Sequence, residues 1–239
     1  MKNLLVSVVV LVALTSCATN NTTNASATVG AEAGKVLSAK EQAALTPDKV
    51  IDVLKQGNQA FVNDKLNAER ISNAASGQYP KAAVLSCLDS RVPVEELFSR
   101  KIGDIFVARV AGNIVNPDIL GSLEFACKVS GAKLIVVLGH GRCGAIKSAI
   151  DGVQLGNITG LLEKIQPAVE QSKATFQGEA KSSNPAFVEA VCHTNVALMV
   201  KEIRKGSPLL KEMEDKGDIK IVGAIYDITN GMVEFFEGM

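Results

Sequence analysis

The sequence predicts an α/β fold: a mainly parallel β-sheet core flanked by helices, with a C-terminal antiparallel edge hairpin and an N-terminal helical arm. Short apolar runs alternate with helical patterns, which is typical of parallel sheets with helical crossovers. The core is aliphatic, because 47% of the 239 residues are hydrophobic but only 4% are aromatic. Asn230-Gly231, between two apolar runs, predicts the hairpin turn. We therefore expect one substantial domain over residues 45–239, without an internal repeat.

The first 44 residues are predicted to precede this domain. Lys2 and an apolar run over residues 4–14 have the plan of a secretory signal, here residues 1–16, and the run is too short to span a membrane comfortably. Leu14-Thr15-Ser16-Cys17 resembles a bacterial lipobox, in which the cysteine is lipidated and becomes the new N-terminus. An ordinary secretory signal cut nearby is the alternative. Residues 17–44, rich in small and polar side chains, predict a flexible tether.

These N-terminal features predict an exported protein. We expect it on the periplasmic side of a bacterial membrane, anchored through lipid on Cys17. Two or three acyl chains would anchor it firmly, whereas a single chain binds membranes only marginally. Ala18 follows the cysteine where an inner-membrane retention signal would have aspartate, so the outer membrane is favoured.

The elements of the domain follow in order along the chain. Thr46-Pro47 pairs a capping residue with a proline at the first helical position and predicts a leading helix to about residue 64. Apolar runs predict strands, at residues 82–86, 105–110, 134–138 and 219–225. Helical patterns predict helices, at residues 94–98, 118–129, 158–171 and 186–205. The hairpin joins residues 225–228 to residues 233–236.

The charge balance argues against a polyanionic partner. Lys plus Arg and Asp plus Glu number 25 each, so the net charge is zero. Proteins that bind nucleic acid carry a basic patch or an excess of positive charge. We expect no nucleic acid partner.

Residues able to hold a metal follow two of the predicted strands. Cys87 in SCLDSR and His140 in GHGRCG both stand where a strand stops, and Cys143 follows three residues after the histidine. In open α/β sheets, ligands gather at the carboxyl ends of parallel strands, so these side chains should be neighbours. Two thiolates and one imidazole suit Zn²⁺ in tetrahedral geometry with one position open, as in catalytic rather than structural sites.

The other cysteines and the second histidine have simpler interpretations. Cys127 and Cys192 lie inside helical patterns and are expected to be small buried core residues, although a disulfide between them stays open in an exported protein. His193 is expected on a helix face.

Asp89 and Arg91 follow Cys87 in the same loop. A guanidinium can pair with a carboxylate through two hydrogen bonds, so Arg91 would direct Asp89 at the metal. Water bound to zinc is acidified, and a nearby carboxylate can accept its hydrogen bond or proton. Taken singly, Asp89-Ser90-Arg91 also fits a capping turn before Pro93. Beside three zinc ligands, the catalytic interpretation is favoured.

Taken together, these motifs resemble the β-class carbonic anhydrases of bacteria and plants, over about residues 45–239. The stretches that carry the resemblance are SCLDSRVP, FVARVAGN, GSLEFA, VVLGHGRCGAI and SPLL…GAIYDITNGMVEFF. The resemblance implies one Zn²⁺ per subunit, on Cys87, His140 and Cys143, with Asp89 and Arg91 as the catalytic pair. It also implies reversible hydration of CO₂ to bicarbonate and a proton, by attack of zinc-bound hydroxide, in a homodimer that may pair into a tetramer.

The resemblance implies further roles. In the family the aspartate, here Asp89, can swing in as a fourth zinc ligand in an inactive state. Gln78 matches a glutamine that binds substrate across the dimer interface, and Gly112 matches a loop whose backbone approaches the substrate. A solvated loop residue and a turn glycine are the alternatives for these two. One branch of the family is regulated by bicarbonate in a pocket that contains tryptophan; this chain has none, although Tyr226 could serve such a pocket.

Two other functions stay open on the sequence. The same fold and zinc site could hydrolyse a CO₂-like molecule such as carbonyl sulfide or carbon disulfide, since linear heterocumulenes need the same attack. A non-catalytic zinc- or bicarbonate-binding module is the other alternative. Asp89 and Arg91 argue against that module, because a binding site needs no carboxylate directed at the water.

Overall fold

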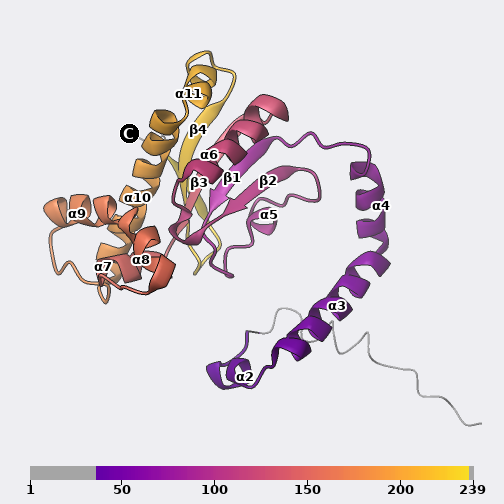
Figure 1. Cartoon of the computed structure of the whole chain (residues 1–239), viewed down its shortest axis with the longest axis horizontal. Coiled ribbons are helices and arrows are strands. Elements are labelled where there is room, and N and C mark those ends of the chain that lie inside the picture. The colour runs from indigo at the N-terminus through magenta and orange to yellow at the C-terminus, as the bar shows by residue number, and fades with distance from the viewer. Residues whose placement is uncertain (1–35, 237–239) are drawn as a thin grey trace, which may run out of the picture. The chain divides into compact units, whose positions relative to one another are not determined.

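The computed structural model describes residues 36–236 of the chain (Figure 1). The predicted signal peptide and Cys17 lie outside the described residues. The chain divides into two compact units, Met1–Ala68 and Glu69–Met239, which are described separately. In the described part, no helix is long and apolar enough to cross a membrane.

The described part of the first unit is helical. Helix α2 (Ala39–Ala43) begins at a capping box formed by Ser38 and Glu41, and it falls within the predicted tether. Helix α3 (Pro47–Asn63) begins as predicted, with the Thr46 side chain accepting a hydrogen bond from the Lys49 N–H at 3.3 Å. Helix α4 (Lys65–Ala74), which the sequence pattern did not predict, crosses the boundary between the units. None of these helices has a buried residue, so their apolar side chains are left exposed.

The second unit is built on a five-stranded sheet with the strand order β2-β1-β3-β4-β5. The strands are β1 (Ala82–Ser86), β2 (Ile105–Arg109), β3 (Leu134–His140), β4 (Lys220–Tyr226) and β5 (Val233–Phe236). The first four strands are parallel, and β5 pairs with β4 in the antiparallel direction. The predicted fold class, a mainly parallel sheet with a C-terminal antiparallel edge hairpin, is therefore confirmed. Gly231 adopts the left-handed φ of 81° that the hairpin turn requires.

Helices cover both faces of the sheet. On one face, strand residues such as Leu85 and Val137 belong to the larger core. This core also contains side chains from the helices that follow β2 and from the helices between β3 and β4. On the other face Val84, Val136 and Leu138 pack with the short helix α5 (Val94–Leu97) and the residues around it. Alternate residues of each strand thus enter different cores, as the period of two requires.

Most predicted helices are present, and two boundaries differ. Helix α6 (Pro117–Glu124) continues into the π-helical turn η2 (Phe125–Val129), which together fill the predicted range 118–129. The single helix predicted over residues 158–171 is wrong. The structure has α8 (Gly156–Glu163) and then α9 (Gln166–Thr175), because Pro167 lacks an N–H and its ring displaces the preceding carbonyls, so it starts a new helix.

Three further helical segments complete the unit. Helices α7 (Gly144–Ile150) and α11 (Pro208–Asp215) were not predicted, whereas α10 (Pro185–Gly206) matches the predicted helix over residues 186–205. Helix α10 lies against β3 and β4 at unusually short range. A Cβ on Gly139 of β3 or on Gly223 of β4 would come within 2.6 Å and 2.8 Å of the Val196 side chain. The two glycines therefore allow α10 to press on the sheet beside the end of β3.

Candidate metal centre

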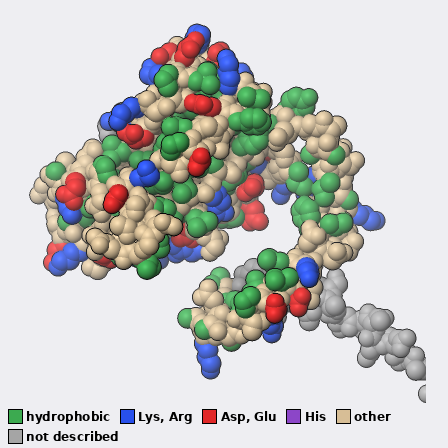
Figure 2. All heavy atoms as spheres, in the orientation of Figure 1, with side chains coloured by type: hydrophobic (Ala, Val, Ile, Leu, Met, Phe, Trp, Pro, Cys, Tyr) green, Lys and Arg blue, Asp and Glu red, His purple; other side chains and the backbone are tan. Residues whose placement is uncertain are grey.

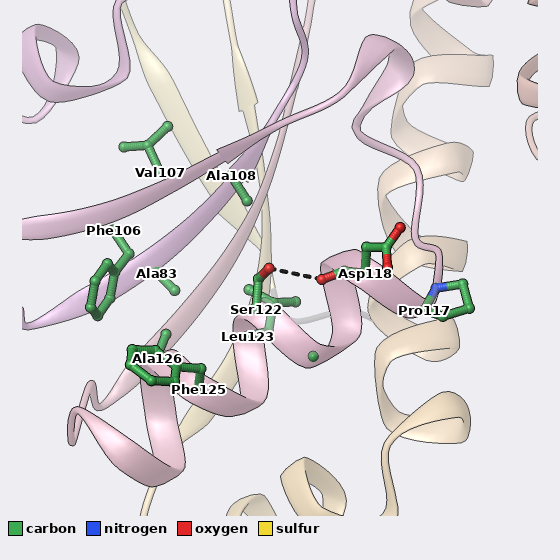
Figure 3. A pocket seen from close by; sticks show the side chains of 11 residues that line it. Ala83, Phe106, Val107, Ala108, Pro117, Asp118, Ser122, Leu123, Phe125 and Ala126 are labelled. Carbon is green, nitrogen blue, oxygen red and sulfur yellow. Dashed lines mark hydrogen bonds between the residues drawn. The ribbon is translucent and has the colours of Figure 1, made fainter.

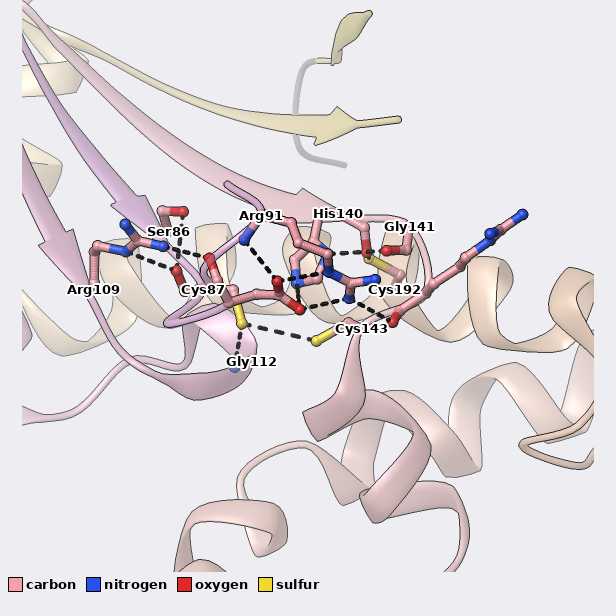
Figure 4. Close-up of polar contacts among 11 residues, drawn as sticks. Ser86, Cys87, Arg91, Arg109, Gly112, His140, Gly141, Cys143 and Cys192 are labelled. Carbon is pink, nitrogen blue, oxygen red and sulfur yellow. Dashed lines mark hydrogen bonds and ion pairs between the residues drawn. The ribbon is translucent and has the colours of Figure 1, made fainter. Parts of the chain in front are cut away.

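Three buried side chains meet at the carboxyl edge of the sheet. Cys87 directly follows β1, His140 is the last residue of β3, and Cys143 caps the N-terminus of α7. Because β1 and β3 are parallel neighbours, their ends bring these residues together. The ligand atoms of all three lie within 4.8 Å of one another, and the Cys87 and Cys143 sulfurs are 3.9 Å apart (Figure 4). The predicted neighbourhood of the two strand ends is confirmed.

The histidine is prepared to donate to a metal. His140 Nδ1 lies 2.9 Å from the Gly141 carbonyl oxygen, which fixes the ring orientation, while Nε2 is buried with no hydrogen-bond partner. A buried nitrogen without a partner destabilises the fold, and metal-bound histidines commonly hold their other nitrogen to a backbone carbonyl. The donor set of two sulfurs and one imidazole therefore fits a tetrahedral zinc ion with one open position.

The two thiols are electrostatically coupled. A hydrogen bond between the sulfurs lowers the pKa of Cys87 to about 4, against the effect of burial. The same bond, together with burial, raises the pKa of Cys143. Cys87 is thus the first of the pair to become a thiolate, and a cation between the sulfurs would favour the loss of the second proton.

Gly112 lies directly beside this cluster. It belongs to the 3₁₀ turn η1 (Ala111–Asn113), and its N–H donates a hydrogen bond to Cys87 Sγ at 3.3 Å. Its φ of 68° is left-handed, and a Cβ there would lie 2.6 Å from Ile165 Cδ1. The turn and the packing of Ile165 therefore favour glycine here, and the contact with substrate that the resemblance implies stays a prediction.

The predicted carboxylate–guanidinium pair forms next to the cluster. Arg91 donates to Asp89 from Nε at 2.9 Å and from Nη2 at 2.7 Å, and its backbone N–H donates to the same carboxylate at 3.0 Å. These bonds lower the pKa of Asp89 to about 2, so the group is a carboxylate at neutral pH. Asp89 Oδ2 lies 3.8 Å from His140 Nε2, the nitrogen that faces the metal position. In this structure Asp89 is bonded to Arg91 rather than completing the donor set.

Three residues that the sequence analysis missed hold the backbone of the site. Arg109, at the end of β2, donates to the carbonyl oxygens of Cys87 at 3.1 Å and Asp89 at 2.5 Å. Cys192 Sγ donates to the His140 carbonyl at 3.2 Å, and Asn195 Nδ2 donates to that of Gly112 at 2.9 Å. Two signals were available in the sequence: Arg109 is a charged residue at the end of an apolar strand, and Asn195 is an amide inside an apolar helix.

The remaining candidate residues lie elsewhere. Gln78 is in the exposed loop between α4 and β1. Cys127 is buried, as predicted for a core residue, and burial raises its pKa to about 11. It and Cys192 are free thiols. His193 lies on an exposed face of α10, with Nε2 3.8 Å from Glu189.

Comparison with known proteins gives a consistent result. The family model for carbonic anhydrase matches residues 82–233. Carbonic anhydrase 2 of Mycobacterium tuberculosis is 32% identical over 188 residues, which cover 74% of this chain and 87% of that protein. The β-carbonic anhydrase CafA of Aspergillus fumigatus superposes with a TM-score of 0.68 at 25% identity, over 80% of this chain and 92% of that one. A tetrameric β-carbonic anhydrase of Sordaria macrospora shares the fold, with a TM-score of 0.68 at 24% identity over 78% and 96%.

A parallel sheet with a Cys-His-Cys cluster and a carboxylate–guanidinium pair at its carboxyl edge defines a β-class carbonic anhydrase architecture. The chain belongs to the carbonic anhydrase family. It is an enzyme of that family, and its reaction is the reversible hydration of CO₂ to bicarbonate and a proton.

Proposed function

We propose that Cys87, His140 and Cys143 hold one Zn²⁺ per subunit and that CO₂ is hydrated there. The observation that carries the proposal is the unpartnered, buried Nε2 of His140 beside two sulfurs 3.9 Å apart. When bound, zinc supplies a Lewis acid that makes water nucleophilic near neutral pH. Two thiolates donate more charge to the metal than two imidazoles would, so the ion would acidify its water less. Neighbouring protein groups such as Asp89 then have to contribute more to activating that water.

We propose that Asp89, oriented by Arg91, accepts the hydrogen bond or the proton of the reacting water. The Asp89 carboxylate accepts a hydrogen bond from the reacting water and, because Arg91 holds both of its oxygens, keeps one orientation. Arg109 fixes the loop itself through two carbonyl oxygens. For Gly112 we keep the role that the resemblance implies, an approach of its loop to the substrate, although the side where a Cβ would lie is filled by Ile165.

The test is CO₂ hydration by stopped flow with zinc quantified on the same sample of the full chain. Cys87→Ser and His140→Ala should lose both metal and activity, because each removes one of three ligands. Cys127→Ala, a buried cysteine outside the cluster, is the matched control and should keep both. Full zinc occupancy in a ligand variant would contradict the assignment. Hydrolysis of carbonyl sulfide or carbon disulfide without CO₂ hydration would favour the alternative hydrolase, and zinc without turnover would favour the binding module.

We further propose that the chain forms a homodimer, or a tetramer built from two such dimers. Strand β2 is an edge of the sheet, and beside it lies a hollow of about 680 Å³ between β2 and helices α6 and η2 (Figure 3). Phe106 and Phe125 line it, and Phe125 is 52% exposed. An unpaired strand edge beside exposed aromatic rings is a surface that proteins usually cover.

The first unit supports the same proposal. Apolar side chains are exposed along α3 and the start of α4 (Figure 2), among them Ile51, Leu54, Val62 and Leu66. Such faces are stable in water only when another surface buries them. A second copy of the chain is the occupant that we propose. Gln78, in the loop just after these helices, could then reach the substrate of the partner subunit.

Export and lipid anchoring are also proposed. The apolar run over residues 4–14 and the Leu14-Thr15-Ser16-Cys17 tetrapeptide support processing at Cys17 and attachment to the periplasmic side of a membrane, with the outer membrane favoured. There the enzyme would interconvert CO₂ and bicarbonate outside the cytoplasm.

A further inference from the structure

Helix α10 contacts the backbone of the site at two places, the end of β3 and the turn η1 beside Cys87. Cys192 donates to the carbonyl of His140, and Asn195 donates to the carbonyl of Gly112. The two side chains are three residues apart and therefore share one face of the helix. Both are buried, with Asn195 1% exposed. A buried amide destabilises the fold unless it is hydrogen-bonded, and here Nδ2 is bonded while Oδ1 has no partner, so the residue is retained at a cost in stability.

The turn that Asn195 holds is conformationally demanding. Gly112 and Asn113 are consecutive left-handed residues, with φ of 68° and 44°. Asparagine tolerates this conformation less well than glycine, so the turn needs support from outside. Asn195 binds the carbonyl of Gly112 at 2.9 Å, while the N–H of the same glycine points at Cys87 Sγ at 3.3 Å. The carbonyl and the N–H of Gly112 belong to different peptide planes, and the plane of the carbonyl is also held by the Asn113 N–H, which donates to the Val110 carbonyl at 2.9 Å. With that plane held and φ kept in the left-handed region, the N–H keeps its direction toward the sulfur.

The position of Asn195 is itself well determined. Its neighbour Val196 fills the space left by Gly139 and Gly223 on the sheet. One turn further along, Met199 Sδ accepts a hydrogen bond from the Val115 N–H at 3.2 Å. Helix α10 cannot shift along the sheet without clashes at these glycines, so the amide is held at a fixed distance from the turn.

We propose that Asn195 is a positioning residue for the Cys87 thiolate. By holding the Gly112 carbonyl, it stabilises the left-handed turn that presents the Gly112 N–H to the sulfur, and this hydrogen bond withdraws negative charge from a metal ligand. The inference rests on the proposed zinc site, since it concerns how strongly Cys87 donates to the metal. Partners of metal ligands typically change metal affinity or activity by about 10- to 100-fold when they are removed.

The alternative is that Asn195 only fills space in the core. Asn195→Leu separates the two interpretations, because leucine has a similar size and no donor. Met199→Leu is the matched control, because it lies on the same helix face and removes a hydrogen bond to the backbone of Val115 rather than to that of Gly112. Cobalt is the probe, because its thiolate complexes show a sulfur-to-metal charge-transfer band.

We expect full-length parent protein to bind Co²⁺ and to show this band. In Asn195→Leu the band should shift to lower energy, since sulfur electrons that lose a hydrogen bond are held less tightly. Co²⁺ affinity should fall about 10- to 100-fold, because the ligand loses the partner that orients it before the metal binds. Met199→Leu should keep the parent band. An unchanged band and affinity in Asn195→Leu would overturn the inference, whereas a parent that binds no cobalt at the thiols would overturn the metal site itself. If the leucine variant does not fold, Asn195→Ala is judged by the same two readouts.

Discussion

Asp89 is held by Arg91 through two parallel hydrogen bonds, of 2.9 Å from Nε and 2.7 Å from Nη2, within 3.8 Å of the metal-facing nitrogen of His140. Charge-assisted pairs of this geometry restrict both partners to one orientation. The carboxylate is 16% exposed, so it is accessible to water from one side while it keeps its charge. This arrangement supports the proposal that Asp89 is the acceptor in the reaction rather than a ligand in the resting state.

Asp89→Asn should therefore keep the metal and lose most of its turnover. The amide keeps the shape of the carboxylate but cannot take up a proton, and general acid–base groups contribute about 10²- to 10⁴-fold to rates. CO₂ hydration and zinc content are measured on the same sample. Asp104→Asn is the control, because Asp104 pairs with Lys81 at the start of β2, away from the cluster. Near-normal turnover in Asp89→Asn would remove the aspartate from the mechanism.

A second prediction concerns the proposed dimer. Phe125 is 52% exposed at the hollow beside the β2 edge. Phe125→Glu would place a charge in the interface, and central aromatic residues of interfaces often contribute about 2 kcal/mol or more. We expect weaker association by sedimentation or light scattering as the protein is diluted. Leu155→Glu, an exposed apolar residue before α8, should associate like the parent. Equal association of the two variants would place the interface elsewhere.

The third prediction concerns stability and pH. Arg204 of α10 donates to Glu214 of α11 at 2.7 Å and 2.9 Å, and Glu214 also accepts from the Ile221 N–H of β4. The Arg204 bonds lower the pKa of Glu214. A lowered pKa stabilises the fold above the unfolded-state value of about 4.3, and this contribution is lost as the pH falls below it.

Glu214→Gln should reduce the free energy of unfolding by about 1–3 kcal/mol at pH 7, since it weakens charged hydrogen bonds at a mostly buried position. The difference between variant and parent should shrink as the pH falls below about 4.3, because Glu214 of the unfolded parent is then protonated while the folded state, with its lowered pKa, resists protonation. Urea unfolding of both proteins at each pH measures this difference in the free energy of unfolding. Glu212→Gln, at a fully exposed pair with Lys216, is the control and should change little. A difference independent of pH would mean that packing, not charge, is responsible.

The sequence predicted the centre of the site because its ligands are encoded locally. Cys87 and His140 each stand at the end of an apolar strand, and parallel pairing brings such ends together without further information. The supports could not be predicted in this way. Arg109, Cys192 and Asn195 act on carbonyl oxygens of other elements, so their roles depend on how α10 and β2 pack. A motif defines the ligands, whereas tertiary packing defines what orients them.

The boundaries of strands and helices also differ in how well the local sequence predicts them. The strand over residues 82–86 was predicted to the residue, because a buried run ends where polar residues begin. The break between α8 and α9 was missed although Pro167 marks it, since the apolar periodicity continues through the proline. Helix α11 follows α10 after one residue and is capped by Ser207, whose hydroxyl accepts from the Leu210 N–H at 3.1 Å.

The fourth prediction concerns localisation. The variant Cys17→Ala should not be lipidated, because the thiol is the attachment point for the acyl chains. It should therefore no longer be found in the membrane fraction. Labelling with a radioactive fatty acid in a two-membrane bacterium, followed by separation of the two membranes, gives both readouts. Ser16→Ala changes the neighbouring residue and keeps the thiol, so it should still be labelled. Label that persists in Cys17→Ala would reject the anchor.

The last prediction is that bicarbonate does not switch this enzyme off. The branch of the family that is regulated uses a tryptophan in its bicarbonate pocket, and this chain has none. Losing one hydrogen-bond donor and part of the wall would weaken such a pocket by about 1–3 kcal/mol, which is as large as typical allosteric coupling energies. Tyr226, the other candidate, is 9% exposed and packs in the same core as Val84 and Leu138, which leaves little of its ring for a ligand.

Asp89 should therefore stay on Arg91 at neutral pH. Moving the carboxylate to the metal would break two short charge-assisted bonds, and the pKa of about 2 shows how strongly Arg91 favours the charged, paired form. We expect kcat/KM to rise with pH through a single ionisation, and added bicarbonate to act only as product. Initial rates across pH, with and without bicarbonate and corrected for product inhibition, test this expectation. A steep rise that involves several protons, together with a crystal form in which Asp89 binds zinc near neutrality, would show that the switch exists despite the missing tryptophan.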